Sequence, residues 1–258
     1  MVKKMKICLA AVSIFATSGL AIEIANTAQA VDIAGKQRMF TQRILKDYAM
    51  IGMSNTFGKP DEDLKKTIGE FEDHLESLMG YTKSDVTKKS LEKVKTLWGS
   101  IKQTLSSAPA KEKVRKLQKD LDLLLKASDE STKLFAKDSG KKFGEIVNIS
   151  GRQRMLSQRM ASLYMLKVWG VDDPEFKKKL DESMQLFKKS QVILEASNLS
   201  TVKIKKILKR TGRSFVFFEM MNRKGSTKYI PTLICKKSND ILVNMNKATL
   251  KYVANETK

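Results

Sequence analysis

Two segments of this 258-residue chain carry one pattern of glycine, arginine and glutamine. Residues 33–48 read IAGKQRMFTQRILKDY and residues 149–164 read ISGRQRMLSQRMASLY, with eight of 16 positions identical. On a helix, residues three and four apart share one face. That face is expected to hold six candidate binding residues: Gly35, Arg38 and Gln42 in the first copy, and Gly151, Arg154 and Gln158 in the second.

The chemistry of this face is that of an anion site. If the two copies face each other across a two-fold axis, Arg38 and Arg154 converge. Two guanidinium groups repel unless an anion lies between them, and each offers a planar fork of donors that suits an oxyanion. Glycine one turn earlier lets another backbone approach. A strip beside this face holds the residues expected to support the site: Met39, Arg43, Met155 and Arg159.

A second interpretation of the same pattern involves no ligand. Paired arginines are common on solvated helices, and a repeated Gln-Arg-Met would also serve as a packing signature between two helices. The spacing shows that the whole segment recurs, and it leaves both interpretations open.

The segments resemble a known sequence box. Ala-Gly-x-x-Arg-Met-x-Thr/Ser-x-Arg is similar to the P-box of nitrate- and nitrite-sensing receptor kinases of the NarX type. The fuller form, Gly-Lys/Arg-Gln-Arg-Met-x-Thr/Ser-Gln-Arg, resembles the N-terminal domain of the type IV pilus methyl-accepting chemoreceptor PilJ. This chain departs from the kinase box at Ser150, which replaces an alanine, and at Gln37 and Gln153, where an apolar residue is usual.

The resemblance implies an exported four-helix bundle with a sensory role. In the nitrate sensors, the arginine before methionine from two symmetry-related first helices holds the anion, assisted by backbone near the glycine. Residue by residue, this points to Arg38 and Arg154 with Gly35 and Gly151 beside them. The tandem arrangement implies that one chain supplies both arginines.

The duplication also predicts the fold. Gly35 and Gly151 lie 116 residues apart, and each copy is followed by two prolines at comparable places. Proline is tolerated in the first turn of a helix and breaks its interior, so each proline marks a helix start. Apolar residues recur every three or four positions between these marks, which is typical of core-facing helices.

We therefore expect an all-α protein with four helices in each half. Two tandem four-helix bundle units, or one elongated bundle with a pseudo-two-fold axis, satisfy this pattern. The stretch 214–221 (SFVFFEMM) could form a strand by itself, but its place in the repeat favours helix. The expected helices are 32–56, 61–80, 84–106, 110–139, 143–169, 174–197, 200–223 and 230–255.

Residues 1–30 have the pattern of a secretory signal peptide. Three lysines precede an apolar stretch at 7–22, which Ala28-Gln29-Ala30 follows. The stretch is short for a membrane span, which needs about 20 residues, so we expect cleavage after Ala30 and a periplasmic protein. An uncleaved membrane anchor is the alternative. The two helical units then occupy 31–140 and 141–258, with a junction at Asp138-Ser139-Gly140.

Composition and single residues exclude several classes of function. The net charge of +21 attracts anions of any kind, but nucleic acid is not an expected target of an exported chain. His74 is the only histidine and is expected on a helix surface, whereas Cys235 is expected in the core. Without a His/Cys cluster, a phosphate loop or a nucleophile motif, we expect no metal, no cofactor and no enzymatic activity.

The sequence thus favours a periplasmic sensory protein that binds nitrate or nitrite and reports to a membrane receptor or pilus component. The alternative is a structural or interaction module that docks on a chemoreceptor, a pilus component or an acidic envelope partner. The sequence does not define an oligomeric state.

Overall fold

The structure, a computed structural model, describes residues 22–138, 142–171, 173–222 and 230–256, and within these ranges it is built from eight α-helices without strands. This confirms the predicted all-α fold. The helices are α1 (Thr27–Gly52), α2 (Pro60–Tyr81), α3 (Asp85–Leu105), α4 (Lys111–Asp138), α5 (Lys142–Val168), α6 (Pro174–Ala196), α7 (Val202–Asn222) and α8 (Pro231–Glu256).

Local sequence signals set most of the helix ends. Pro60, Pro174 and Pro231 are each the first residue of a helix, and Pro109 lies two residues before α4. Proline fits this position because its fixed φ suits the first turn and its missing N–H has no intrahelical acceptor there. The prolines therefore mark helix starts as predicted.

The first helix differs most from its predicted range of 32–56. It begins at Thr27, because the Asn26 side chain accepts a hydrogen bond from the Gln29 backbone N–H at 2.9 Å and caps the helix. It ends at Gly52, and Ser54 adopts a positive φ of 55°. The expected cleavage point after Ala30 thus lies in the first turns of α1, and cleavage there stays a prediction.

Three further predictions concern the apolar stretch 214–221, the leader and the junction between the two halves. Residues 214–221 lie within α7, so this apolar stretch is helical as expected. The leader residues 1–21 and the junction residues 139–141 lie outside the described part of the chain. No helix in the described ranges is both long enough and apolar enough to cross a membrane.

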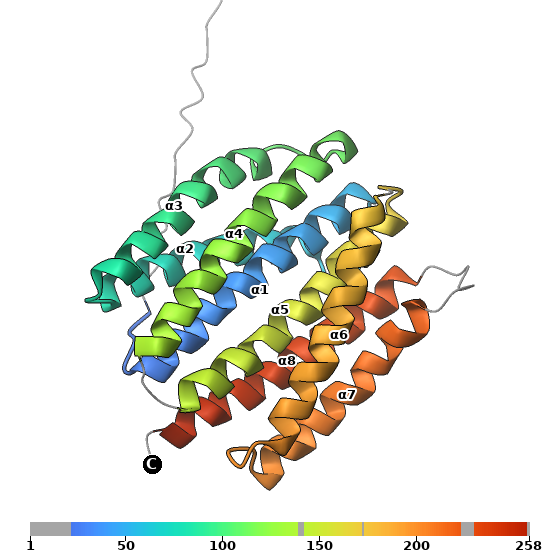
Figure 1. Cartoon of the computed structure of the whole chain (residues 1–258). Coiled ribbons are helices and arrows are strands. Elements are labelled where there is room, and N and C mark those ends of the chain that lie inside the picture. Colours follow the sequence, from blue (N-terminus) through green and yellow to red (C-terminus); the bar gives the residue numbers. More distant parts are fainter. Residues whose placement is uncertain (1–21, 139–141, 172, 223–229, 257–258) are drawn as a thin grey trace, which may run out of the picture.

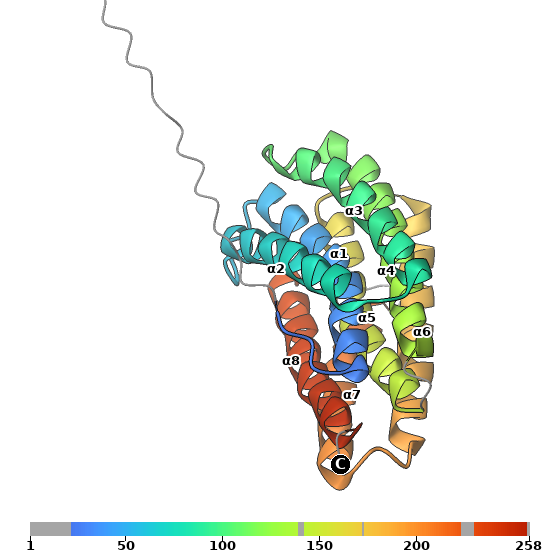
Figure 2. The same cartoon turned by 90° about the vertical axis from the view of Figure 1, so that its left-hand side faces the viewer.

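The helices form two four-helix units that share one core. In the first unit α1 packs on α2 and α4, and in the second α5 packs on α6 and α8. Among the described helices, α1 and α5 share the most extensive contact, and the buried apolar residues of both units form a single cluster. Figures 1 and 2 show α2 and α3 on the outer side of one unit and α6 and α7 on the outer side of the other.

Equivalent contacts recur in both units and show the pseudo-two-fold relation. Tyr48 Oη accepts a hydrogen bond from the Ala110 backbone N–H at 3.0 Å, and Tyr164 Oη accepts one from the Ile230 N–H at 2.8 Å. Gly35 faces Gly151 near the start of α1 and α5, while Gly52 faces the Trp169 ring near their ends. The two repeated helices therefore run parallel to each other.

Candidate functional site

The two copies of the box meet where α1 crosses α5. A Cβ atom on Gly35 would lie 4.0 Å from the Gly151 Cα atom. Side chains on a helix point back toward its N-terminus, so arginines one turn after these glycines reach back to the crossing. The absence of glycine side chains leaves room there for two guanidinium groups.

Arg38 and Arg154 converge at this crossing, as the repeat predicted. Their Nη2 atoms lie 3.3 and 3.4 Å from the position of a Cβ atom on Gly35. For Gly151 the distances are 3.5 Å from Arg38 and 3.0 Å from Arg154. Both arginine side chains have 0% of their surface exposed, so the pair sits in the centre of the molecule.

Arg38 is held by residues of both units. Its Nη1 atom lies 2.5 Å from the Asp129 carboxylate on α4, and its Nη2 donates to the backbone carbonyl of Asn148 on α5 at 3.2 Å. Asp129 also lies 2.7 Å from the Lys133 ammonium, and its side chain is 27% exposed. The Arg38 ion pair therefore reaches the edge of the core.

Arg154 has partners at the positions equivalent to those of Arg38, but the acidic and amide residues are exchanged between the two positions. Its Nη1 atom lies 2.7 Å from the Asp32 carboxylate on α1 and donates to Asn246 Oδ1 on α8 at 3.1 Å. Its Nη2 donates to the Asp32 carbonyl at 3.2 Å. The residue equivalent to Asp32 is Asn148, and the residue equivalent to Asp129 is Asn246. Each arginine therefore has one carboxylate partner, which lies on α1 for Arg154 and on α4 for Arg38.

These two carboxylates are the site residues that the sequence did not reveal. Asp32 directly precedes the repeated segment and aligns with Asn148, so extending the alignment by one residue would have drawn attention to it. Asp129 lies 91 residues after Arg38 among other polar residues of α4. No local pattern marks it, because its role depends on how α4 is rotated against α1.

Burial and charge together set the ionisation of this cluster. Burial lowers the pKa of Arg38 to about 10, helped by repulsion from Arg152 and Arg154 and partly offset by Asp129. Burial would raise the pKa of Asp32, but Arg154 and Lys36 outweigh it and the pKa is lowered. Arg38 and Asp32 are therefore both charged at neutral pH.

Asp129 responds in the same way. Burial raises its pKa, but the charges of Arg38 and Lys133 more than offset this, and its pKa is lowered. The cluster then holds two carboxylates against five cations, which are Arg38, Arg154, Lys36, Arg152 and Lys133. The site keeps a positive excess after both ion pairs have formed.

The glutamines of the box serve the framework around the arginines. Gln37 Nε2 donates to the Phe71 carbonyl at 2.9 Å, and Gln153 Nε2 donates to the Phe187 carbonyl at 3.1 Å. Each ties the first helix of its unit to the second. Each buried amide therefore has a backbone acceptor on the neighbouring helix.

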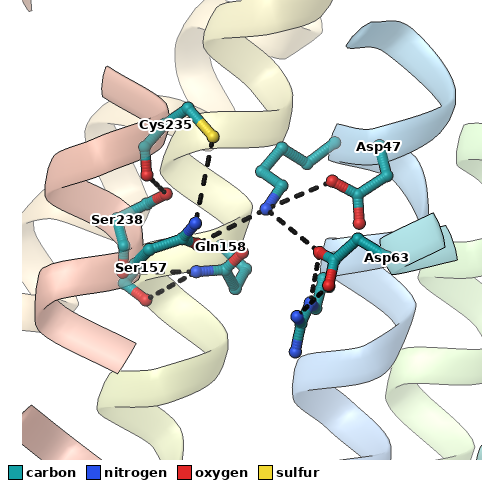
Figure 3. A network of polar contacts seen from close by, with 9 residues as sticks. Asp47, Asp63, Ser157, Gln158, Cys235 and Ser238 are labelled. Carbon is teal, nitrogen blue, oxygen red and sulfur yellow. Dashed lines mark hydrogen bonds and ion pairs between the residues drawn. The ribbon is translucent and has the colours of Figure 1, made fainter. Parts of the chain in front are cut away.

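Gln42 and Gln158 were predicted to line the anion site, and both are buried. Gln42 Nε2 donates to Thr41 Oγ1 at 3.0 Å, and Gln158 Nε2 donates to the Ser238 carbonyl at 3.3 Å. Gln158 belongs to a polar network between α5, α8 and α1 that Figure 3 shows. The described hydrogen bonds of both glutamines go to the framework, and their role toward a ligand stays a prediction.

The four predicted supporting residues lie beside the crossing. Met39 and Met155 are buried in the shared core. Arg43 pairs with Asp63 on α2, and Arg159 lies 3.2 Å from the Asp122 carboxylate on α4. The neighbouring strip of the box thus supplies packing and inter-helix ion pairs.

The prediction for His74 was wrong, whereas that for Cys235 is confirmed. Cys235 is buried as expected. His74 is also buried, with its ring centroid 5.1 Å from that of Phe40, because it lies on the inner face of α2. Burial and the nearby Lys36 lower its pKa to about 4. Among the described residues no His, Cys, Asp and Glu side chains form a metal-binding cluster.

Comparison with known families identifies the family of the chain. The chain matches the PilJ family, described as the type IV pili methyl-accepting chemotaxis transducer N-terminal domain, over residues 23–128 and 136–207. The two matched segments contain one copy of the box each, and together they cover more than half of the chain. The protein belongs to this family of chemotaxis transducer domains, which are sensory. Searches among curated proteins and solved structures found no match.

Proposed function

We propose that this protein is a non-catalytic sensory protein for a small oxyanion, nitrate or nitrite, which binds between α1 and α5. The observation that carries the proposal is the convergence of Arg38 Nη2 and Arg154 Nη2 at Gly35 and Gly151. A planar monovalent anion accepts hydrogen bonds from two such forks at once. The positive excess of the cluster adds an attraction that the two carboxylates do not cancel.

Binding requires the anion to compete with Asp32 and Asp129. Each carboxylate compensates one buried guanidinium, so the anion gains only the difference between its own contacts and those it displaces. This predicts an affinity on the order of micromolar rather than nanomolar. Asp129 is the partner expected to yield, because its side chain is 27% exposed and water can solvate it once it is released.

Release of Asp129 would give the anion a mechanical effect. The Arg38–Asp129 pair joins α1 to α4, and an anion held by both arginines would strengthen the contact between α1 and α5 instead. A ligand shifts a conformational equilibrium by its difference in affinity for the two states. The proposed signal is therefore a change in how α4 packs on α1, which a membrane receptor or pilus component would read.

Calorimetric titration with nitrate, nitrite and chloride tests the proposal. Gly151→Ala places a methyl group 3.0 Å from Arg154 Nη2 and keeps both arginines, so it should abolish oxyanion binding. Gly69→Ala on α2 is the matched control, since a Cβ atom there meets nothing within 4 Å. Equal heats from wild type and Gly151→Ala would refute an anion site at the crossing.

A second candidate function follows from the ion pairs. Because both arginines already have a carboxylate partner, the cluster also satisfies the requirements of a purely structural core. The protein would then act as an interaction module that docks on a chemoreceptor, pilus component or acidic envelope partner. If no small oxyanion raises the melting temperature above its value in chloride, this candidate is favoured.

The expected location of the protein depends on its N-terminal segment, residues 1–30. We propose export to the periplasm through the N-terminal segment, followed by cleavage. Intact mass of the protein recovered from a periplasmic extract measures the cleavage point, and retention of the full leader mass in the membrane fraction would favour the anchored alternative.

A further inference from the structure

The outer seam between α7 and α8 opens into a groove. The two helices lie side by side at the edge of the molecule (Figure 1) and bury Phe215, Phe218, Ile241 and Met245 between them and the core. Outside this apolar base lies a cavity of about 430 Å³. Its lining residues are Arg210, Arg213, Ser214, Phe217, Lys237, Asn239, Asp240, Val243 and Asn244.

The groove combines positive charge with an apolar floor. Arg210 and Arg213 are exposed, and neither forms an ion pair with any residue of the described ranges. Lys237 lies 4.6 Å from the centre of the Phe217 ring, and 3.4 Å from the Asp240 carboxylate. A ligand with carboxylates next to an apolar side chain matches this surface.

The first unit provides an internal reference for this surface. Trp98 on α3 stacks on Phe71 with ring centroids 4.3 Å apart, and Phe215 on α7 stacks on Phe187 at 4.4 Å. Phe215 on α7 lies 117 positions after Trp98, and Asn246 on α8 lies 117 positions after Asp129, the equivalent partner on α4. A residue of α7 or α8 therefore corresponds to the residue 117 positions earlier. The groove can then be compared position by position with the α3–α4 seam.

The equivalent seam of the first unit has a different charge pattern. Lys93 stands at the position of Arg210 and lies 3.1 Å from the Glu130 carboxylate. Asp120 stands at the position of Lys237 and lies 2.6 Å from the ammonium group of the lysine one turn before it. The first unit folds with ion pairs at both of these positions. The unpaired charges of Arg210 and Arg213 in the second unit are therefore not a requirement of the fold.

We propose that the α7–α8 groove docks an acidic segment of a partner protein. Carboxylates of that segment would pair with Arg210 and Arg213, and an apolar side chain between them would lie on Phe217 and Val243. The surface is recessed between two helices, and the Asp240 carboxylate in it is paired with Lys237. A protruding peptide side chain fits this shape better than a membrane surface does.

The groove is also connected to the first unit. Asn239 lines the groove, and its Oδ1 atom accepts a hydrogen bond from Lys46 Nζ on α1 at 3.5 Å. Lys46 is buried, and its ammonium lies 3.2 Å from the carboxylate of Asp47, which Figure 3 labels. A partner in the groove would thus contact a residue that touches α1, the helix that carries Arg38.

Fluorescence anisotropy with a labelled peptide of repeated Glu-Glu-Leu tests the proposal on the full protein. The double variant Arg210→Gln/Arg213→Gln removes two charges from the groove. Lys203→Gln/Lys205→Gln removes two exposed charges from the same helix outside the groove and is the matched control. We expect the groove variant to weaken binding about tenfold or more and the control less than about threefold, since contact pairs outweigh screened attraction.

Several outcomes would overturn the proposal. Equal weakening by both variants would mean diffuse attraction to a basic helix, and no binding by wild type would exclude the docking site. If vesicles containing phosphatidylglycerol bind wild type and lose binding in the groove variant, while the peptide does not bind, the groove contacts lipid instead. Unchanged melting temperatures of both variants establish that they remain folded.

Discussion

Arg38 and Arg154 occupy equivalent positions but depend on their carboxylates to different degrees. Arg154 pairs with Asp32, whose side chain is 3% exposed, whereas Arg38 pairs with Asp129, whose side chain is 27% exposed. Duplication within one chain has allowed the two halves of the site to diverge. One half is a fixed internal ion pair and the other ends at the protein surface, where a partner can be exchanged.

The largest difference between the halves should be seen in stability. Asp32→Asn leaves the Arg154 guanidinium buried without a counterion, and we expect the free energy of unfolding to fall by about 3 kcal/mol. Asp129→Asn also leaves a buried guanidinium, that of Arg38, without its carboxylate, but water can reach the 27% exposed position of Asp129, so we expect a smaller loss of about 2 kcal/mol. Urea denaturation of both variants measures the difference. A larger loss for Asp129→Asn would contradict the assignment of Asp32 as the fixed half.

A second asymmetry concerns the buried pair Lys46–Asp47, which Ser162 and Leu163 replace in the second unit. Asp47→Leu alone should cost about 3 kcal/mol, because Lys46 loses its closest carboxylate. The double variant Lys46→Ser/Asp47→Leu should be close to wild type in stability, since a buried ion pair exchanged for the residues of the other unit leaves no orphaned charge. Equal destabilisation of the single and double variants would show that the pair contributes more than its desolvation costs.

The same pair predicts a pH dependence. Burial raises the pKa of Asp47 to about 7, with Lys46 opposing this and Asp63 adding to it. Because the folded-state pKa lies above the ordinary value, this group contributes stability that is full below about pH 4 and is lost as the pH rises through 7. Relative to the Lys46→Ser/Asp47→Leu variant, wild type should lose stability between pH 4 and pH 7 in urea titrations. A flat difference across that range would contradict the raised pKa.

The glycines give a smaller comparison. The Trp169 ring occupies the place of a Cβ atom on Gly52, so Gly52→Ala forces α1 and the end of α5 apart and should cost about 2 kcal/mol. Gly69→Ala has open space and should stabilise α2 by about 1 kcal/mol, because alanine is the better helix former. Thermal melting should show a lower melting temperature for Gly52→Ala and a higher one for Gly69→Ala. A stabilising Gly52→Ala would mean that the two helices do not meet at Trp169.

Much of the fold could be predicted from the sequence because its strongest signals are local or repeated. The prolines and the apolar periodicity predicted eight helices. The duplicated box predicted that Arg38 and Arg154 face each other. The identity of Asp129 as a partner could not be predicted, since a position on α4 depends on helix rotation in the folded protein. The burial of His74 was missed for a different reason. His74 lies three residues after Phe71 and four before Leu78, so helical spacing places it on the apolar face of α2 although its ring is polar.

The pairing of Asp129 with Arg38 provides the most direct test of the proposed anion site. If nitrate binds by displacing this carboxylate, Asp129→Asn should bind nitrate about tenfold more tightly than wild type, a gain of about 1.4 kcal/mol. Adding Gly151→Ala should abolish the binding. Calorimetric titration of wild type and both variants gives the three values. Nitrate binding that Asp129→Asn leaves unchanged or weakens would contradict an anion held between the two arginines.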